Sequence, residues 1–476
     1  MSFETWTLED AEIRLIDGDR GKNYPKQADF NASGHCLFLS AKNVTSSGFQ
    51  FSDPVFIGKE RHDLLRAGTL ERGDIVMTTR GTIGNVAYYD SSVSYPLVRI
   101  NSGMMIFRAN QELWNTRFLY YVLTSPVIQD QITSLTSGSA VPQLPARDLK
   151  KFALPKVPLS VQNRIEAIIS SLSDKLSLNQ RINQTLEQMA QAIFKSWFVD
   201  FEPVKAKIAA LEAGGSEEDV LLAAMQTISG DAQGCANAAG GRMPGAAKGD
   251  KLTRLQTEQP EQYAELRATA ELFPSAMQDS ELGEIPEGWG VKPVGEILNR
   301  LKPKRRFTKK QVAPAGSVPV FEQGTDILLG FHDDAPGFIA TPEDPTFIFG
   351  DHTCITHLSC QSFDISQNVI PLKGRSRPTI WTYYALQGIQ TFQEYRRHWA
   401  ELIVKEVIYP PADICEYFSE TVSSLIRLKE QLDTESTSLK EIRAALLPKL
   451  LSGELSVIDA EDQLTEEEPM PREEIN

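Results

Sequence analysis

The residues best suited to bind an anion lie in one short basic segment in the second half of the chain. Six bases fall within nine residues of the run LKPKRRFTKK, and these are Lys302, Lys304, Arg305, Arg306, Lys309 and Lys310. Cations at this density can neutralise several phosphates of a nucleic-acid backbone, and each contact steepens the salt dependence of binding. A solvated loop that touches no ligand is the alternative. The segment therefore predicts a phosphate-binding surface.

Shorter polar loops elsewhere combine arginine or lysine with glycine. Residues 78–84 read TTRGTIG and follow the β-type run DIVM, and residues 374–377 read GRSR. An arginine at a strand end beside glycine can present two donors to the O6 and N7 atoms of guanine. A tight turn in which Arg80 pairs with a nearby acid is the alternative. Residues 20–26 form another basic, glycine-containing loop that could contact a nucleic-acid backbone. The candidate DNA-binding residues are Lys22, Asn23, Thr79, Arg80, Lys304, Arg305, Arg306, Lys309, Lys310, Arg375 and Arg377.

The run DHTCITHLSC, residues 351–360, has the composition of a metal site. Its two cysteines have five residues between them and histidines interleaved, a spacing that fits no zinc motif. In an alternating strand His352 and Cys354 would share one face and His357 the other, so a half-buried strand is favoured. The chain contains no P-loop and no serine or cysteine triad. We therefore predict no catalytic residue and no metal ligand.

A duplication determines how these segments are arranged. A proline-ended strand followed by a long heptad helix runs from about Leu154 to Phe198, and a second copy runs from about Val407 to Leu451, at an offset of 253 residues. Apolar residues recur at alternating steps of three and four, which is the a and d spacing of a coiled coil. Each helix follows a globular block, so the duplication predicts a pseudo-twofold molecule with two similar heads.

The predicted seam of the two helices is apolar at most positions. Asn179 is the exception in the first helix, and a buried seam asparagine often fixes helix register at some cost in stability. A seam that is simply less buried at Asn179 and Lys175, which align in the repeat with Leu432 and Leu428, is the alternative. The predicted seam residues are Ile165, Leu172, Asn179, Leu186, Ile193, Phe418, Leu425, Leu432, Leu439 and Leu446.

Composition restricts the class of protein. A length of 476 residues predicts two to four domains, and 41% hydrophobic residues is ordinary for a globular protein. The N-terminal segment does not resemble a signal peptide, no apolar run is long enough to span a membrane, and five scattered cysteines fit a reducing compartment, so we expect a cytoplasmic location. The net charge of −15 comes mainly from residues 205–287 and from the tail after residue 458, whereas residues 288–410 carry 14 bases and 12 acids. Global acidity therefore says little about the heads.

These patterns divide the chain into six segments with mixed α/β heads. Short β-type runs and one helical stretch make up each head, and the segment rich in Ala, Gly, Glu and Gln predicts a partly disordered linker with one or two short helices. The predicted segments are a first head at 1–153, a first long helix at 154–202, a linker or insert at 203–287, a second head at 288–406, a second long helix at 407–455 and an acidic disordered tail at 456–476.

The order of several short motifs resembles the specificity subunit of type I restriction–modification enzymes. They are the IPEGW opening at residues 285–289, FKSWFVDF at 194–201, LPKVPLSVQNRI at 154–165 and LLPKLLSGEL at 446–455. The similarity covers nearly the whole chain except residues 205–285 and the tail. It implies an α/β (α+β) fold with two target recognition domains separated by two long antiparallel coiled-coil helices.

The resemblance also implies a function. The chain would be a non-catalytic DNA reader, in which each head recognises one half of a split asymmetric sequence and the helices set the gap. Two methylation subunits would carry S-adenosylmethionine, and two restriction subunits, which are motor nucleases, would use ATP and Mg. No cofactor is expected on this chain. The alternatives are a coiled-coil scaffold with protein-binding heads, and a fused DNA-modifying enzyme.

Overall fold

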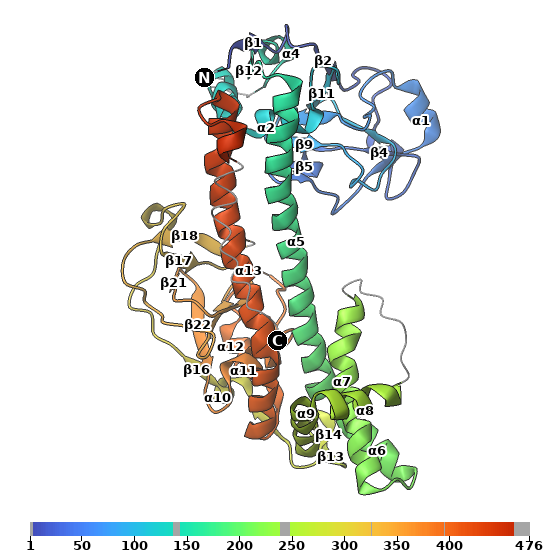
Figure 1. Cartoon of the computed structure of the whole chain (residues 1–476), viewed down its shortest axis with the longest axis vertical. Coiled ribbons are helices and arrows are strands. Elements are labelled where there is room, and N and C mark those ends of the chain that lie inside the picture. Colours follow the sequence, from blue (N-terminus) through green and yellow to red (C-terminus); the bar gives the residue numbers. More distant parts are fainter. Residues whose placement is uncertain (1–2, 137–142, 239–247, 325, 395, 461–476) are drawn as a thin grey trace. The chain divides into compact units, whose positions relative to one another are not determined.

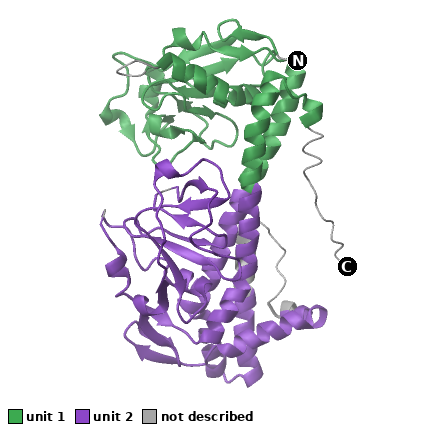
Figure 2. Cartoon of the chain, turned by 90° about the vertical axis from the view of Figure 1, so that its left-hand side faces the viewer, with its two compact units in different colours: residues 1–177, 436–476 green, residues 178–435 purple. Residues whose placement is uncertain are grey.

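The computed structural model describes residues 3–136, 143–238, 248–324, 326–394 and 396–460. The chain forms two compact units, the first made of residues 1–177 and 436–476 and the second of residues 178–435 (Figure 2). Both unit boundaries fall within the longest helices, α5 (Leu159–Phe198) and α13 (Ala412–Ser452). Each unit therefore contains one head and part of each long helix.

The head of unit 1 is built on a four-stranded antiparallel sheet and a second sheet that includes a parallel pair (Figure 1). In the first sheet the order is β2 (Ile13–Asp17), β11 (Met104–Ala109), β8 (Ile75–Thr78) and β9 (Val86–Tyr88). In the second the order is β10 (Val98–Arg99), β4 (Cys36–Phe38), β7 (Phe56–Ile57) and β3 (Phe30–Asn31), with β10 parallel to β4. Two smaller pairs are β1 (Thr5–Thr7) with β12 (Ala153–Pro155), and β5 (Val44–Thr45) with β6 (Gly48–Phe49).

Three helices pack the first head against the first part of α5, and they are α2 (Thr116–Thr124), α3 (Pro126–Thr136) and α4 (Ala146–Leu149). The short helix α1 (Lys59–Leu64) lies on the other side of the head (Figure 1). The side chain of Asn115 caps α2 by accepting hydrogen bonds from the amides of Arg117 and Phe118, which satisfies donors that a helix start leaves free. The Gln162 side chain of α5 accepts from the Asn115 amide at 2.9 Å. The cap of α2 is therefore fixed to the long helix.

The head of unit 2 repeats this topology with different strand lengths. Its antiparallel sheet has the order β16 (Leu298–Arg300), β22 (Val369–Gly374), β19 (Thr346–Gly350) and β20 (Thr356–Ser359). Its second sheet has the order β18 (Leu328–His332), β17 (Val318–Phe321) and β21 (Asp364–Ile365), with β17 parallel to β21. The pair β15 (Gly290–Pro293) with β23 (Glu406–Tyr409) matches β1 with β12. Its short helices are α10 (Val294–Ile297), α11 (Thr379–Ala385) and α12 (Trp399–Leu402).

The offset of 253 residues found in the sequence also relates the elements that lead into the long helices. It takes α4 onto α12, the start of β12 onto that of β23, and the start of α5 onto that of α13. The match continues beyond the long helices, since Val204 and Val457 are both buried at this offset. The predicted mixed α/β fold with an internal repeat is confirmed.

In both units α5 and α13 run antiparallel. In unit 2, Asn183 contacts Asp433 at 2.6 Å and Glu187 contacts Lys429 at 2.9 Å, so the residue number falls along α13 as it rises along α5. In unit 1, Arg443 of α13 contacts Ser173 of α5 at 3.5 Å. The residues of α13 that follow Glu435 pack beside the start of α5, and those that precede it pack beside the end of α5, each within its own unit (Figure 1).

Most predicted seam positions are buried, and Asn179 is among them. Asn179 is 3% exposed and donates to the Glu435 carboxylate at 2.7 Å. A buried amide that bonds to a charged acceptor is satisfied only in one register, which supports its role as a register residue. Leu425 and Leu432 are half-buried, and the fully or largely buried seam residues are Ile165, Leu172, Leu186, Ile193, Phe418, Leu439 and Leu446.

Two positions of the aligned heptads do not lie in a seam. Leu428 is 42% exposed and Lys175 is exposed. In unit 2, α13 has a buried aliphatic and aromatic stripe of Ile414, Phe418, Val422 and Ile426, which recur every four residues, with Cys415 and Ser419 buried beside it. This stripe packs against the second head as well as α5, because its core includes Trp381 of α11 and Trp197 of α5. Because α13 packs on the second head as well as on α5, its buried face differs from the face that the heptad spacing predicts.

Residues 203–287 contain more helix than the sequence predicted. The described residues of this region form α6 (Glu202–Glu212), α7 (Glu217–Ala238), α8 (Lys248–Glu258) and α9 (Pro260–Leu272), followed by the hairpin β13 (Met277–Ser280) and β14 (Gly283–Pro286). Met225 of α7 and Phe273 join the core at the end of α5, where Phe273 meets Trp197 edge to face at 5.4 Å. The predicted acidic tail from Glu461 onward, and residues 239–247 of the linker, lie outside the described residues. None of the described helices is long and apolar enough to cross a membrane.

The buried stripe of α13 gives a stability prediction. Phe418 is fully buried and its ring contacts those of Phe194, Trp197 and Phe198. We expect Phe418→Ala to lower the free energy of unfolding by about 3–5 kcal/mol, measured by urea denaturation of the full chain. Leu428→Ala on the same helix is the matched control and should change it by less than about 1 kcal/mol. Equal losses in the two variants would contradict the observed helix packing.

Candidate nucleic-acid interface

In the first head, the predicted arginine is exposed at the tip of a rigid hairpin. The loop between β8 and β9 is closed by the Thr78 amide, which donates to the Asn85 carbonyl at 2.9 Å, and the Thr79 amide donates to the Gly103 carbonyl at 2.8 Å. Thr79 is only 5% exposed, whereas Arg80 is exposed and Gly81 adopts φ +74° beside open space. No ion pair to Arg80 is found among the described residues. Arg80 is therefore accessible to a ligand, whereas the buried Thr79 side chain has a structural role.

The loop at residues 20–26 exposes three cations. Lys22 and Lys26 are exposed, and Arg20 is exposed and pairs with Asp17 at 2.8 Å. The Asn23 side chain donates to the Leu64 carbonyl at 3.3 Å, and the backbone carbonyl of Asn23 accepts from the Arg61 side chain at 3.3 Å. Asn23 thus ties the loop to α1, which accounts for it structurally.

The basic segment at residues 302–310 divides into residues that hold the loop and residues that are free. Arg306 is half-buried and donates to the carbonyls of Ser366 and Val369 at 2.7 and 2.9 Å, and burial lowers the pKa of its guanidinium. Arg305 lies 4.1 Å from the centre of the Phe307 ring and pairs with Asp334 at 3.0 Å. The exposed lysines of the segment are Lys302, Lys304, Lys309 and Lys310.

A buried histidine, His332, packs against the same basic segment. The ring of His332 stacks on Phe307 at 4.4 Å between centres, and its Nε2 lies 3.1 Å from the buried Asp364 carboxylate. The Asp334 amide donates to His332 Nδ1. Because Nδ1 accepts a hydrogen bond, Nε2 is the protonated nitrogen, and it donates a hydrogen bond to the Asp364 carboxylate. The segment is therefore fixed by a stack that continues from Arg305 through Phe307 to His332.

The second basic loop of this head, residues 374–377, contains one arginine that holds the structure together and one that is exposed. Arg377 donates twice to the Pro410 carbonyl, at 3.0 and 2.7 Å, and lies 4.1 Å from the centre of the Tyr409 ring. These contacts tie α11 to the start of α13. Arg375 is exposed, and its backbone amide donates to the Ile297 carbonyl at 2.9 Å. Arg375 is thus the residue of this loop that can reach a ligand.

The His- and Cys-rich run at residues 351–360 is a turn followed by a strand. β20 begins only at Thr356, because Cys354 has φ +58° and breaks the extended conformation predicted for this run. Burial raises the pKa of the Cys354 thiol, and raises that of Cys360 to about 12, so both thiols stay protonated at neutral pH. Among the described residues no cluster of three His, Cys, Asp or Glu side chains could hold a metal ion.

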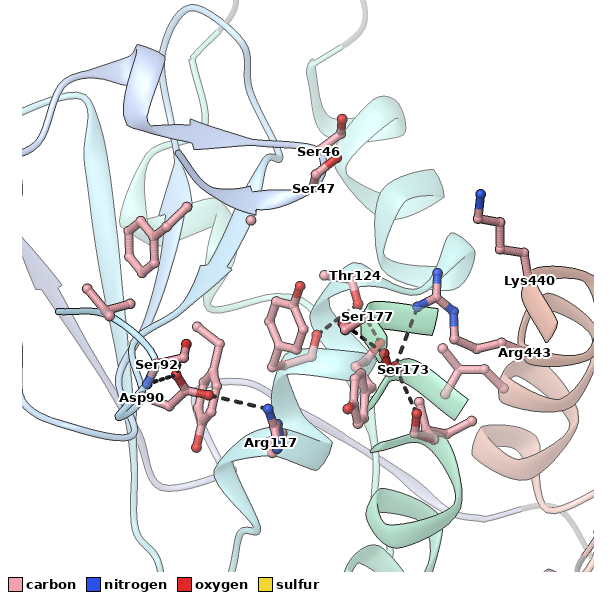
Figure 3. Close-up of a pocket in the computed structure, with 18 of the residues that line it drawn as sticks. Ser46, Ser47, Asp90, Ser92, Arg117, Thr124, Ser173, Ser177, Lys440 and Arg443 are labelled. Carbon is pink, nitrogen blue, oxygen red and sulfur yellow. Dashed lines mark hydrogen bonds and ion pairs between the residues drawn. The ribbon is translucent and has the colours of Figure 1, made fainter. Parts of the chain in front are cut away.

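Unit 1 also contains a groove that the sequence did not predict. Its volume is about 970 Å³, and Figure 3 shows it between the first head and the two long helices. On the head side Arg117 pairs with Asp90 at 3.3 Å, and on the helix side Arg443 donates to Ser173. Hydroxyl groups line much of the remainder, and the labelled ones are Ser46, Ser47, Ser92, Thr124 and Ser177. Tyr121 of α2, which lines the groove, bonds to Ser170 of α5 at 3.0 Å and so joins the head to the helix.

Comparisons with known proteins agree on one family. The domain family described as the type I restriction modification DNA specificity domain matches residues 11–188. The chain is 28% identical to the type I restriction enzyme HindI specificity subunit of Haemophilus influenzae, over 92% of this chain and 98% of that one. It is 22% identical to the MjaIX specificity subunit of Methanocaldococcus jannaschii, over 81% of this chain and 78% of that one.

Solved structures of S subunits also align along most of the chain. One is the type I restriction–modification S subunit from M. genitalium, with 14% identity, a TM-score of 0.48 and coverage of 95% of this chain and 96% of that one. Another is the HsdS subunit from Thermoanaerobacter tengcongensis, with 16% identity, a TM-score of 0.28 and coverage of 96% and 95%.

Two α/β heads of one topology, each attached to long helices and each presenting exposed cations on loops, define a two-headed recognition protein. Residues 11–188 match the type I restriction modification DNA specificity domain, and over most of its length the chain is similar to specificity subunits of type I restriction enzymes.

The division of the basic segment can be tested with matched variants. Replacing both Lys309 and Lys310 with alanine should leave the free energy of unfolding within about 0.5 kcal/mol and reduce the slope of log K against log salt for DNA binding by about 1–2. Arg306→Ala leaves two buried carbonyls without their donor and should cost about 1–3 kcal/mol of stability. A stability loss in the lysine variant, or none in Arg306→Ala, would contradict this division.

A pH dependence follows from His357 on β20. Burial, with a smaller contribution from Lys429, lowers the pKa of His357 to about 4 from an ordinary value of 6.5. The folded state therefore binds a proton less readily than the unfolded state, and stability should fall as pH drops from about 6.5 to about 4. We expect a loss of roughly 1–3 kcal/mol over this interval, measured by urea denaturation at several pH values. His357→Gln should flatten that part of the profile, and an unchanged slope would contradict the assignment.

Proposed function

We propose that this chain recognises a split, asymmetric DNA sequence, with one half of the target read by each head, and that it has no catalytic activity of its own. The observation that carries the proposal is the repetition of one scaffold with different loops. The hairpins β8–β9 and β19–β20 are closed by equivalent backbone hydrogen bonds, from Thr78 to Asn85 and from Gly350 to Ile355. They enclose different sequences, TRGTIG and DHTC. A shared frame with unlike tips suits two unlike half-sites.

The long helices are proposed to set the gap between the half-sites. Each head is bonded to helix residues of its own unit. In unit 1 this is the bond between Tyr121 and Ser170, and in unit 2 the Cys360 amide donates to the Glu430 carboxylate at 2.9 Å. A head fixed in this way moves with the helix, so helix length would convert directly into spacing along DNA.

The chemistry is proposed to reside in partner subunits. Two methylation subunits would supply S-adenosylmethionine, and two restriction subunits would supply ATP and Mg. Since the target is genomic DNA, the place of action is proposed to be the cytoplasm. The heads would bring these activities to one site through binding energy alone.

Activity measurements test the assignment. The purified chain alone should transfer no methyl group and cut no DNA, and adding the methylation subunits should produce adenine methylation at one split sequence. The readout is methylation-sensitive sequencing of DNA exposed to the assembled enzyme. Turnover by the chain alone would refute the proposal.

The spacer role predicts a change in the gap. Removing seven residues from α5 near residue 177, and seven from α13 near residue 436, shortens each helix by about 10 Å. With about 3.4 Å per base pair, we expect the gap between the half-sites to shrink by about three base pairs while both half-sites keep their sequence. Leu428→Ala should leave the gap unchanged. An altered half-site in the shortened protein would contradict the division between heads and helices.

A further inference from the structure

The tip of the hairpin in each head is braced by a second loop. In unit 1 the Leu144 amide donates to the Thr79 carbonyl at 3.0 Å, shortly before α4. In unit 2 the His398 amide donates to the Asp351 carbonyl at 2.8 Å, immediately before α12. Thr79 and Asp351 each follow the closing residue of their hairpin, so the two braces are equivalent.

The two heads place an arginine at this brace from different segments. In the first head the arginine is Arg80, which follows the braced Thr79 on the hairpin itself. The hairpin tip of the second head, DHTC, contains no arginine. There Arg397 precedes the bracing His398, and its Nε lies 3.9 Å from the Asp351 carboxylate. The Arg397 side chain is 78% exposed.

An exposed aromatic residue lies on the same bracing loop. Phe392 is 54% exposed and is the one aromatic residue among the large hydrophobic residues that the described part of the chain exposes. Its ring contacts that of His398 at 6.2 Å. Base faces are stacked in a duplex, so the apolar group that this ring can meet in the major groove is the C5-methyl group of a thymine.

Buried hydrogen bonds anchor His398, although Phe392 and Arg397 of the same loop are exposed. His398 is fully buried, its Nε2 lies 3.1 Å from the Glu394 carbonyl, and its Nδ1 lies 3.2 Å from the Gln390 side chain. The Asp351 carboxylate accepts from the amides of His398 and Trp399 at 3.1 and 2.9 Å. A loop fixed in this way loses little conformational entropy on binding.

The surrounding charge distinguishes base contact from phosphate contact. Arg396 is paired with Glu401 at 2.9 Å and Glu394 at 3.2 Å, and Asp351 lies beside Arg397. Each arginine of the pair thus has a carboxylate beside it, which weakens its attraction for phosphate. An arginine oriented by a carboxylate can still present its remaining donors to the edge of a base.

We propose that Arg397 and Phe392 form the base-reading element of the second head, at the position that Arg80 occupies in the first. Arg397 donates to the O6 and N7 atoms of a guanine, and Phe392 packs against the C5-methyl group of a neighbouring thymine. This inference rests on the proposed function, because it assigns residues within one half of the DNA site.

The test compares the base preferences of variants of the full chain assembled with its methylation subunits. Bound sequences are selected from a randomised DNA library, and the preference at every position is measured for the wild type, Arg397→Ala, Arg397→Lys, Phe392→Ala and Arg80→Ala. Arg427→Ala, an exposed arginine on α13 paired with Glu343, is the control. Thermal unfolding of each variant checks that the fold is retained.

We expect Arg397→Ala to weaken selection of a guanine in one half-site by about 10-fold or more, as loss of a bidentate contact implies, and to leave the other half-site unchanged. Arg397→Lys should relax the same position with a smaller loss of affinity, and Phe392→Ala should weaken binding through the same half-site. Arg80→Ala should affect the opposite half-site only. Unchanged preferences, or equal losses in both half-sites, would overturn the inference. Failure of the wild type to select any split sequence would instead refute the proposed function.

Discussion

The structure depends on the burial of α5 and α13 against two different surfaces at once. Within each unit a long helix packs on its partner helix and on the adjoining head, so one apolar stripe serves both contacts. Phe418 shows the arrangement, because its ring meets Trp197 of α5 and Tyr384 of α11. Burial of such aromatic side chains contributes about 1.5–3 kcal/mol each. Because the same side chains stabilise helix pairing and head attachment, a head cannot reorient without disturbing the helices.

That coupling separates the cations of the heads into two groups. Arg306 and Arg377 donate to backbone carbonyls that belong to other segments, and in this way hold loops in place. Lys309, Lys310 and Arg375 remain exposed. The first group has little freedom to vary, since a buried carbonyl without a donor is costly, whereas the second group can change with the ligand. A common scaffold can thus be retained while the sequence that it recognises changes.

The sequence predicted those features that depend on interactions between residues close together in the chain, and missed those that depend on contacts between distant segments. The long helices lie within the predicted segments 154–202 and 407–455, because heptad spacing and the preceding prolines act locally, and α13 continues through Pro448. Leu428 occupies a heptad position of the repeat but is exposed, because packing on the head shifts the buried face of α13. Burial of Arg306 could not be predicted, since its acceptors lie sixty residues further along the chain. Arg397 was missed for a similar reason: no turn motif surrounds it, and only the contact of His398 with Asp351 places it beside a hairpin tip.

The start of the first head and the end of the second long helix are neighbours, since the Phe3 amide donates to the Ser452 carbonyl at 3.2 Å. At the matching junction of the other repeat, the link from α5 to β15 is made by the covalent insert that contains α6 to α9. The fold therefore does not require the two heads to occur in this order along the polypeptide. A circularly permuted chain, joined by a short linker between these neighbours and opened between α7 and α8, would preserve every strand pairing described here.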